Sequence, residues 1–208
     1  MNAKIDFAEI SKAAWKGFKS QCWLLMGLLI GFTIVYSILF LFAFPAKGEP
    51  MRISGLIVGI ICVIFQCLFV MGYLKNCLQT VDGEEPQFSA YGQVSRKLLA
   101  FLPVFILFPI VITLGFALFF FPGVYLLLRF QFLFASVVDD ETGVIASIKR
   151  SWNITKGHTM QLFVLMLIQM AIFVVGMIVL GVGIIAATPF TALMYAYAYR
   201  KLTAPTST

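Results

Sequence analysis

Six apolar stretches, most of them long enough to cross a membrane, restrict the folds open to this sequence. A helix needs about 20 predominantly apolar residues to cross the roughly 30 Å hydrocarbon core of a bilayer. Hydrophobic residues make up 61% of the chain and charged residues only 12%, against roughly 25% charged in a typical soluble domain. We therefore expect an all-α polytopic transmembrane bundle. Its six predicted spans are about 22–44, 53–74, 98–121, 124–138, 160–180 and 184–199.

The distribution of Lys and Arg predicts the orientation of these spans. Six spans place both termini on the same side of the membrane. The segments predicted on that side, 1–21, 75–97, 139–159 and 200–208, hold twelve Lys and Arg residues. The opposite side holds only Lys47 and Arg52. Because short cytoplasmic loops carry the excess of Lys and Arg, both termini are expected in the cytoplasm.

A basic amphipathic helix is predicted ahead of the first span. Apolar residues of segment 4–19 recur at helical spacing, and Lys12, Lys16 and Lys19 share the opposite face. Such a helix lies in the plane of the membrane interface, where lysines suit anionic lipid headgroups. These three lysines are therefore candidate lipid-binding residues.

A second helix of the same type is predicted at about 143–156, ahead of the fifth span. Its lysines, Lys149 and Lys156, are further candidates for contact with lipid. Lys12, Trp15 and Lys19 recur as Lys149, Trp152 and Lys156 at one constant offset.

This recurrence, with a short helix around Phe88–Ser95 as the middle copy, predicts a parallel repeat. Each copy would be an interfacial helix followed by a hairpin, so a bundle with pseudo-threefold character is expected. The predicted single membrane domain, 1–202, then divides into units at about 1–74, 75–139 and 140–202, with a disordered tail at 203–208.

Arg129 is the one basic residue inside a predicted span. Counting along a continuous helix from Asp139 places it roughly 15 Å deep, where a guanidinium must face protein or water. On that helix Tyr125, Arg129, Ser136 and Asp140 would share one polar stripe. Arg129, Tyr125 and Ser136 are therefore candidates for an anion or lipid-phosphate site. The favoured alternative is a structural arginine, held between helices or extending toward an interface.

Two GxxxG patterns, Gly27/Gly31 and Gly55/Gly59, allow close approach of helices. They fall at opposite depths of the first hairpin, so each is expected to pack against some other helix.

The sequence carries none of the motifs of acyl or phosphoryl transfer. It contains no GxSxG, no P-loop and no HExxH. It has one His and no Cys/His cluster, which argues against a structural zinc site. We therefore expect no enzymatic activity, no cofactor and no metal, and the positive charge is interpreted as an orientation signal rather than as a nucleic-acid surface.

One region resembles a known superfamily. The residues that carry the resemblance are Pro122-Gly123-Val124, Val137-Val138-Asp139, Gly143–Ser147, Ser151-Trp152 and Thr155. The chain is similar there, over roughly 120–165, to six-span prokaryotic membrane proteins, among them the membrane domain fused to some glycerophosphodiester phosphodiesterases and related small inner-membrane proteins. The resemblance implies a prokaryotic inner membrane and a non-catalytic role. These 208 residues hold no counterpart of the soluble catalytic barrel, so hydrolase activity is not implied.

The sequence thus favours a non-enzymatic inner-membrane protein that engages anionic lipid, or a membrane protein partner, through basic interfacial helices. The alternative is a small transporter or channel in which Arg129 forms an intramembrane anion site.

Overall fold

The computed structural model describes residues 6–43, 53–139, 143–179 and 183–204. Within these ranges every regular element is an α-helix, which confirms the predicted all-α class. The helices are α1 (Phe7–Ala43), α2 (Ile53–Val81), α3 (Ser89–Ser95), α4 (Leu98–Leu118), α5 (Phe120–Arg129), α6 (Leu133–Asp139), α7 (Val144–Thr155), α8 (Thr159–Ile178) and α9 (Gly183–Thr203).

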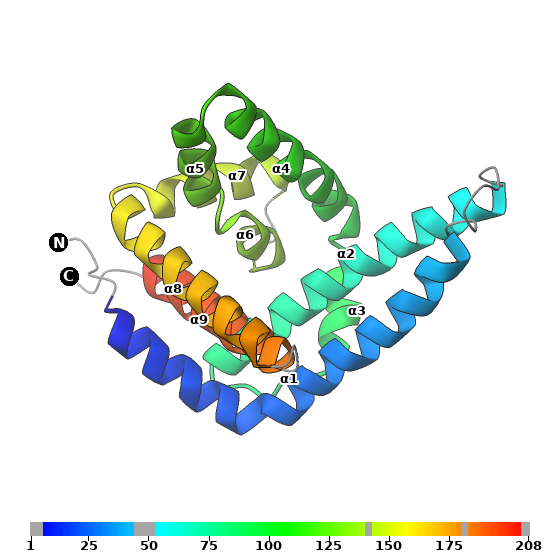
Figure 1. Ribbon diagram of the computed structural model, residues 1–208, viewed down its shortest axis with the longest axis horizontal. Coiled ribbons are helices and arrows are strands. Elements are labelled where there is room, and N and C mark those ends of the chain that lie inside the picture. Colours follow the sequence, from blue (N-terminus) through cyan, green and yellow to red (C-terminus); the bar gives the residue numbers. More distant parts are fainter. Residues whose placement is uncertain (1–5, 44–52, 140–142, 180–182, 205–208) are drawn as a thin grey trace.

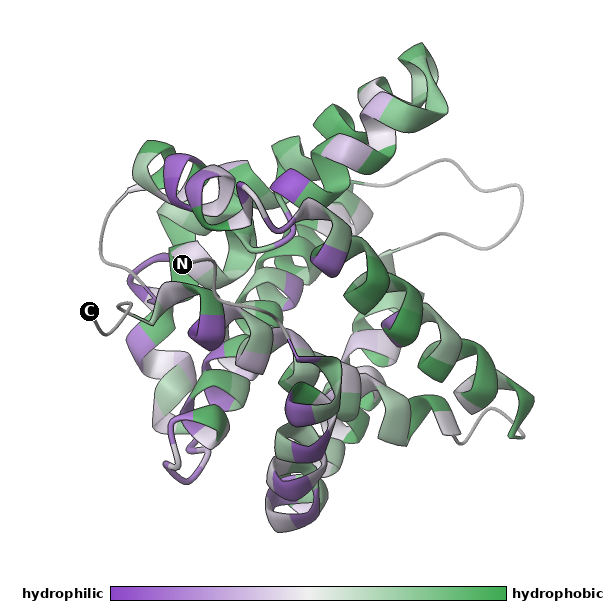
Figure 2. Ribbon diagram, turned by 90° about the vertical axis from the view of Figure 1, so that its left-hand side faces the viewer, coloured by the Kyte–Doolittle hydropathy of each residue, from purple (hydrophilic) through white to green (hydrophobic). Residues whose placement is uncertain are grey.

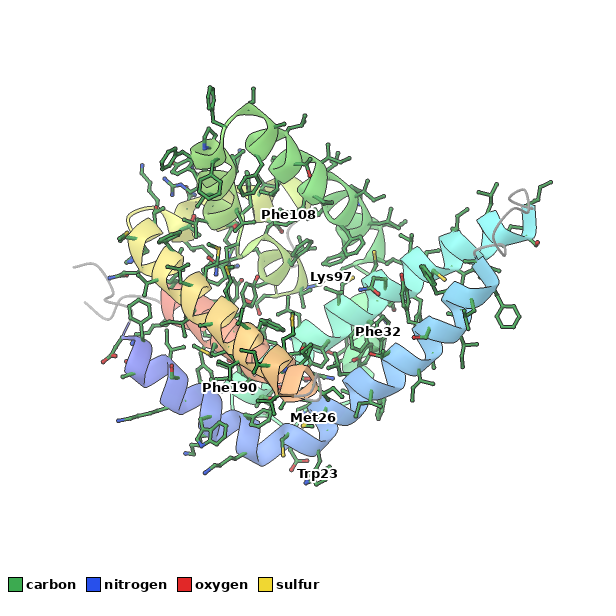
Figure 3. The ribbon with its side chains drawn as sticks, in the orientation of Figure 1. Trp23, Met26, Phe32, Lys97, Phe108 and Phe190 are labelled. Carbon is green, nitrogen blue, oxygen red and sulfur yellow. The ribbon has the colours of Figure 1, made fainter. Side chains whose placement is uncertain are left out.

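Helix α1 is longer than the sequence predicts. The expected boundary between an interfacial helix and the first span is wrong, because α1 runs unbroken from Phe7 to Ala43. It bends instead, and Trp23 lies at the bend (Figures 1 and 3). Ser20 Oγ donates a hydrogen bond to Gly17 O just before the bend, at 2.9 Å, and Gly/Ser pairs are a common cause of helix kinks. The parts of α1 before and after the bend therefore run in different directions.

The far half of α1 and the first half of α2 form a hairpin that extends away from the remaining helices (Figure 1). The rings of Phe32 and Phe69 stack between them, with centroids 3.6 Å apart. Residues 44–52, which hold the predicted turn with Lys47 and Arg52, lie outside the described residues. Toward its C-terminal end α2 enters the core, where Met71, Cys77 and Leu78 are fully buried.

The predicted fourth span is broken. Helix α5 ends at Arg129, and α6 begins at Leu133. The sequence between them contains neither Gly nor Pro, so no local signal marks the break. The predicted continuous helix at 124–138 is therefore wrong. The break turns the chain inward, and Leu133 and Ala135–Val138 of α6 are buried in the core.

Helix α9 lies at the centre of the molecule although it is one of the more polar long helices. It packs against α1, α2 and α8, and Leu193, Met194, Ala196 and Tyr199 are fully buried. Its C-terminal end reaches Thr203, the first residue of the predicted disordered tail. Residues 205–208 lie outside the described residues.

Within the described ranges, five helical segments are long and apolar enough to cross a membrane: α1, α2, α4, Phe120–Asp139 (α5 with α6) and α8. This indicates a membrane protein. Hydrophobic residues dominate the helices that extend outward, and hydrophilic residues gather mainly in the half of the molecule where both termini lie (Figure 2).

Candidate functional site

Arg129, the last residue of α5, is held by neutral partners. Its side chain is nearly buried, with 8% of the residue exposed. Nε donates to the hydroxyl of Tyr125 at 3.0 Å, and Nη1 donates to the carbonyl oxygen of Trp152 at 3.3 Å. The guanidinium carbon also lies 5.2 Å from the ring centroid of Tyr125 and 4.8 Å from that of Trp152. Cation–π contacts of this kind stabilise a guanidinium that has left water.

Helix α7 supplies hydrogen-bond donors to the C-terminal end of α5, where the fourth span is broken. Ser151 Oγ and Thr155 Oγ1 both donate to the carbonyl oxygen of Arg129, at 3.0 and 3.3 Å. The two hydroxyls lie four residues apart and therefore on one face of α7. From α9, Tyr195 OH donates to Gln131 O at 2.8 Å. Backbone carbonyls freed from a helix inside a protein need hydrogen-bond partners, and these three side chains supply them.

Only part of the predicted polar stripe of Tyr125, Arg129, Ser136 and Asp140 is found on one helix. Tyr125 and Arg129 are in contact, as their spacing indicates. Ser136 is fully buried on α6, beyond the break, so the helical geometry that placed it beside Arg129 does not apply. Asp140 lies outside the described residues. The predicted depth of Arg129 is counted along a continuous helix, so the break removes the basis of that count.

Lys12, Lys16 and Lys19 are all exposed on the first part of α1. Ile10, Ala14 and Gly17 of the same segment are buried, and a Cβ at Gly17 would lie 3.3 Å from Thr80 Cγ2. Lys19 Nζ lies 5.3 Å from the ring centroid of Trp15. We call Lys12, Lys16 and Lys19 the α1 cationic face.

Lys149 and Lys156 are also exposed, on α7 and directly after it. They flank the turns of α7 that hold Arg129. The structure thus brings the predicted candidates together in two groups on different elements: Tyr125 and Arg129 beside α7 with its lysines, and the α1 cationic face.

An ion-pair cluster that the sequence did not predict joins the ends of three helices. Arg200 at the end of α9 pairs with Asp139 at the end of α6 and with Asp82, the residue after α2. Arg150 of α7 approaches Asp139 at 3.7 Å. Lys201 pairs with Glu9 of α1.

Sequence reasoning also missed the roles of Ser151, Trp152 and Thr155. The available signal was the spacing of Ser151 and Thr155, whose hydroxyls lie four residues apart on one face of a basic helix. Their partner, Arg129, is more than twenty residues away, so its identity required the tertiary fold. In the described part of the chain no group of three or more His, Cys, Asp or Glu side chains could hold a metal ion.

No protein-family model, curated protein or solved structure matches this chain.

Proposed function

We propose that this chain is a non-enzymatic integral protein of a prokaryotic cytoplasmic membrane that engages anionic lipid through its basic helix faces. The observation that carries the proposal is the α1 cationic face. Ile10 and Ala14 are buried on one side of this segment, three lysines are exposed, and the same helix continues into an apolar span. Lysines joined so directly to a span lie at headgroup level, where each contributes about 1 kcal/mol of attraction to an anionic surface.

We further propose six spans, with α9 as the sixth and both termini in the cytoplasm. Three tyrosines, three threonines and a proline lower the hydropathy of α9. Its central position supports a transmembrane role, because a span enclosed by other helices needs little lipid-facing surface. The excess of Lys and Arg at the ends that carry the termini supports this orientation.

The proposed threefold repeat is supported by the ion-pair cluster. Asp82, Asp139 and Arg200 stand at the C-terminal ends of α2, α6 and α9. These are the second helices of the three proposed hairpins, although α2 runs past the boundary at 74 and Asp82 itself falls within 75–139. Their contact is what three hairpins in the same orientation would produce. The resemblance around 120–165 is consistent with this layout and with a non-catalytic role.

The alternative is a small transporter or channel. The observation that favours it is the broken helix at Arg129, because discontinuous helices often form ion sites in transporters. The contacts of Arg129 favour the structural role. Its Nε and Nη1 already have neutral partners, and two aromatic rings cover the guanidinium.

The test replaces Lys12, Lys16 and Lys19 together with Gln. The variant is reconstituted in nanodiscs of equal phosphatidylglycerol and phosphatidylcholine, and the retained lipids are counted by native mass spectrometry. We expect the preference for phosphatidylglycerol to fall by at least about tenfold. The matched triple Arg variant keeps the charges and should keep the preference. An unchanged ratio in the Gln variant would refute lipid engagement at this face.

A further inference from the structure

An apolar groove of about 640 Å³ lies between α1, α2 and α3. Trp23, Gly27 and Gly31 line it from α1, Phe69 from α2 and Tyr91 from α3. The aromatic walls are fixed by packing inside the protein: the ring of Phe69 stacks on Phe32, and its centroid lies 6.5 Å from that of Tyr91. Nearly all of the lining is apolar, so the occupant must present a hydrocarbon surface.

The glycines of the first GxxxG pattern are open to this groove. A Cβ built on Gly27 or on Gly31 would meet nothing within 4 Å. The expectation that this pair packs against another helix of the chain is therefore wrong within the described residues. By contrast, a Cβ on Gly55 of the second pattern would lie 2.8 Å from Ala43 O. Gly27 and Gly31 deepen the groove without serving a contact in the fold.

The length of the groove distinguishes between a lipid chain and a transmembrane helix. Along α1 the lining runs from Trp23 to Val35, which is roughly 18 Å at 1.5 Å per residue. One leaflet contributes about 15 Å of hydrocarbon, half of the roughly 30 Å core. A partner helix would cross both leaflets, whereas the lining of the groove ends at Val35. The groove therefore fits an acyl chain of one leaflet.

Polar and cationic side chains adjoin the lining. Trp23 is 88% exposed, in keeping with the headgroup level at which tryptophans gather. Lys19 lies one helical turn before it on α1. On α3, Ser95 contributes a hydroxyl to the lining, and the exposed Arg96 follows it. Both cations are neighbours of the lining in sequence; Lys19 Nζ lies over the ring of Trp15, 5.3 Å from its centroid, and must turn toward the groove to reach a phosphate there.

We propose that this groove binds one phospholipid of the leaflet that faces the α1 cationic face. One acyl chain lies against Gly27 and Gly31, and the phosphate lies near Lys19 and Arg96. The inference rests on the proposed function, because it takes α1 to enter the membrane at an anionic surface. It adds a defined binding site to a general surface attraction.

The test fills the groove with the double variant Gly27→Leu, Gly31→Leu. Because both positions are open and Leu favours helix more than Gly does, the variant should fold and be at least as stable as the original. Native mass spectrometry of protein released from phosphatidylglycerol nanodiscs should show one tightly held phospholipid on the original chain and none on the double variant.

Gly59→Leu is the matched control. A Cβ there also meets nothing within 4 Å, and Gly59 lines a different hollow, toward Ile106 of α4. The control should keep the tightly held lipid. If the double variant keeps it as well, the groove is not a lipid site. If the original chain is a dimer and the double variant a monomer, the groove binds a second copy, and the proposal is also refuted.

The lysine variant separates this inference from the proposed function. Lys12→Gln, Lys16→Gln, Lys19→Gln should lose the preference for phosphatidylglycerol while a lipid of either headgroup still occupies the groove. An unchanged headgroup preference, together with loss of the lipid in the glycine variant, would refute the proposed function and leave the groove site standing.

Discussion

Arg200 Nη1 donates hydrogen bonds to both carboxylate oxygens of Asp139, at 2.9 and 2.8 Å, across 61 residues of sequence. Its Nη2 reaches Asp82 Oδ2 at 2.5 Å, and Tyr199 OH donates to Asp139 Oδ2 at 3.2 Å. One guanidinium therefore fixes the C-terminal ends of α2, α6 and α9 relative to one another. Removing it would leave the mostly buried carboxylate of Asp139 and the exposed carboxylate of Asp82 without this partner.

Replacing Arg200 with Gln should destabilise the bundle by about 2 kcal/mol, because hydrogen bonds to charged groups contribute roughly 1.5–3 kcal/mol and Asp139 would remain mostly buried. The measurement is thermal unfolding in nanodiscs. Glu85→Gln removes an exposed charge outside the cluster and should leave the unfolding temperature unchanged. Equal unfolding temperatures for both variants would show that the cluster does not hold the helix ends together.

Removing the α7 hydroxyls should weaken the junction between α5 and α6. Ser151→Ala removes a donor to the Arg129 carbonyl, and we expect a loss of about 1 kcal/mol. Thr155→Val should cost less, because Thr155 Oγ1 lies closer to Ser151 O of its own helix, at 2.8 Å, than to Arg129 O, at 3.3 Å. Thr33→Val is the control, because Thr33 Oγ1 donates to Leu29 O within its own helix at an exposed position. A loss no larger than that of the control would contradict the role given to α7.

Arg129→Met tests whether Arg129 is structural. The variant removes the hydrogen bonds to Tyr125 OH and Trp152 O and both cation–π contacts, so the unfolding temperature should fall while lipid retention is unchanged. Arg129→Lys keeps the charge but not the planar guanidinium, and we expect it to restore only part of the stability. Loss of a bound anion with unchanged stability would instead favour the transporter alternative.

The sequence predicts the helices well where periodicity and length decide them. The starts of α2 and α4, the short helix α3 and the basic helix α7 all lie within two residues of their expected positions. These elements are specified locally, by apolar runs and by the spacing of Lys and aromatic residues. The predicted position of Tyr125 beside Arg129 follows from the same local geometry.

Long-range contacts decide what the sequence did not predict. The break after Arg129 depends on hydroxyls of Ser151, Thr155 and Tyr195, 22 to 64 residues from the carbonyls that they bond. The Arg200 cluster likewise joins the ends of elements that are far apart in the chain. The predicted boundary between the interfacial helix and the first span was wrong for a local reason. No residue near Ser20 ends the helix, so α1 continues through this point and only bends.

We propose that six spans bring both ends of the chain, with the α1 cationic face, to one side of the membrane. This proposal is tested most directly by cysteine accessibility in intact cells. The four native cysteines, all free, are replaced by Ala, and single cysteines are introduced as Lys16→Cys, Lys47→Cys and Thr203→Cys. A membrane-impermeant thiol reagent should label only position 47, and a permeant reagent should label all three. If positions 16 and 203 are labelled from opposite sides, the chain has an odd number of spans, α9 does not cross the membrane, and the parallel arrangement is wrong.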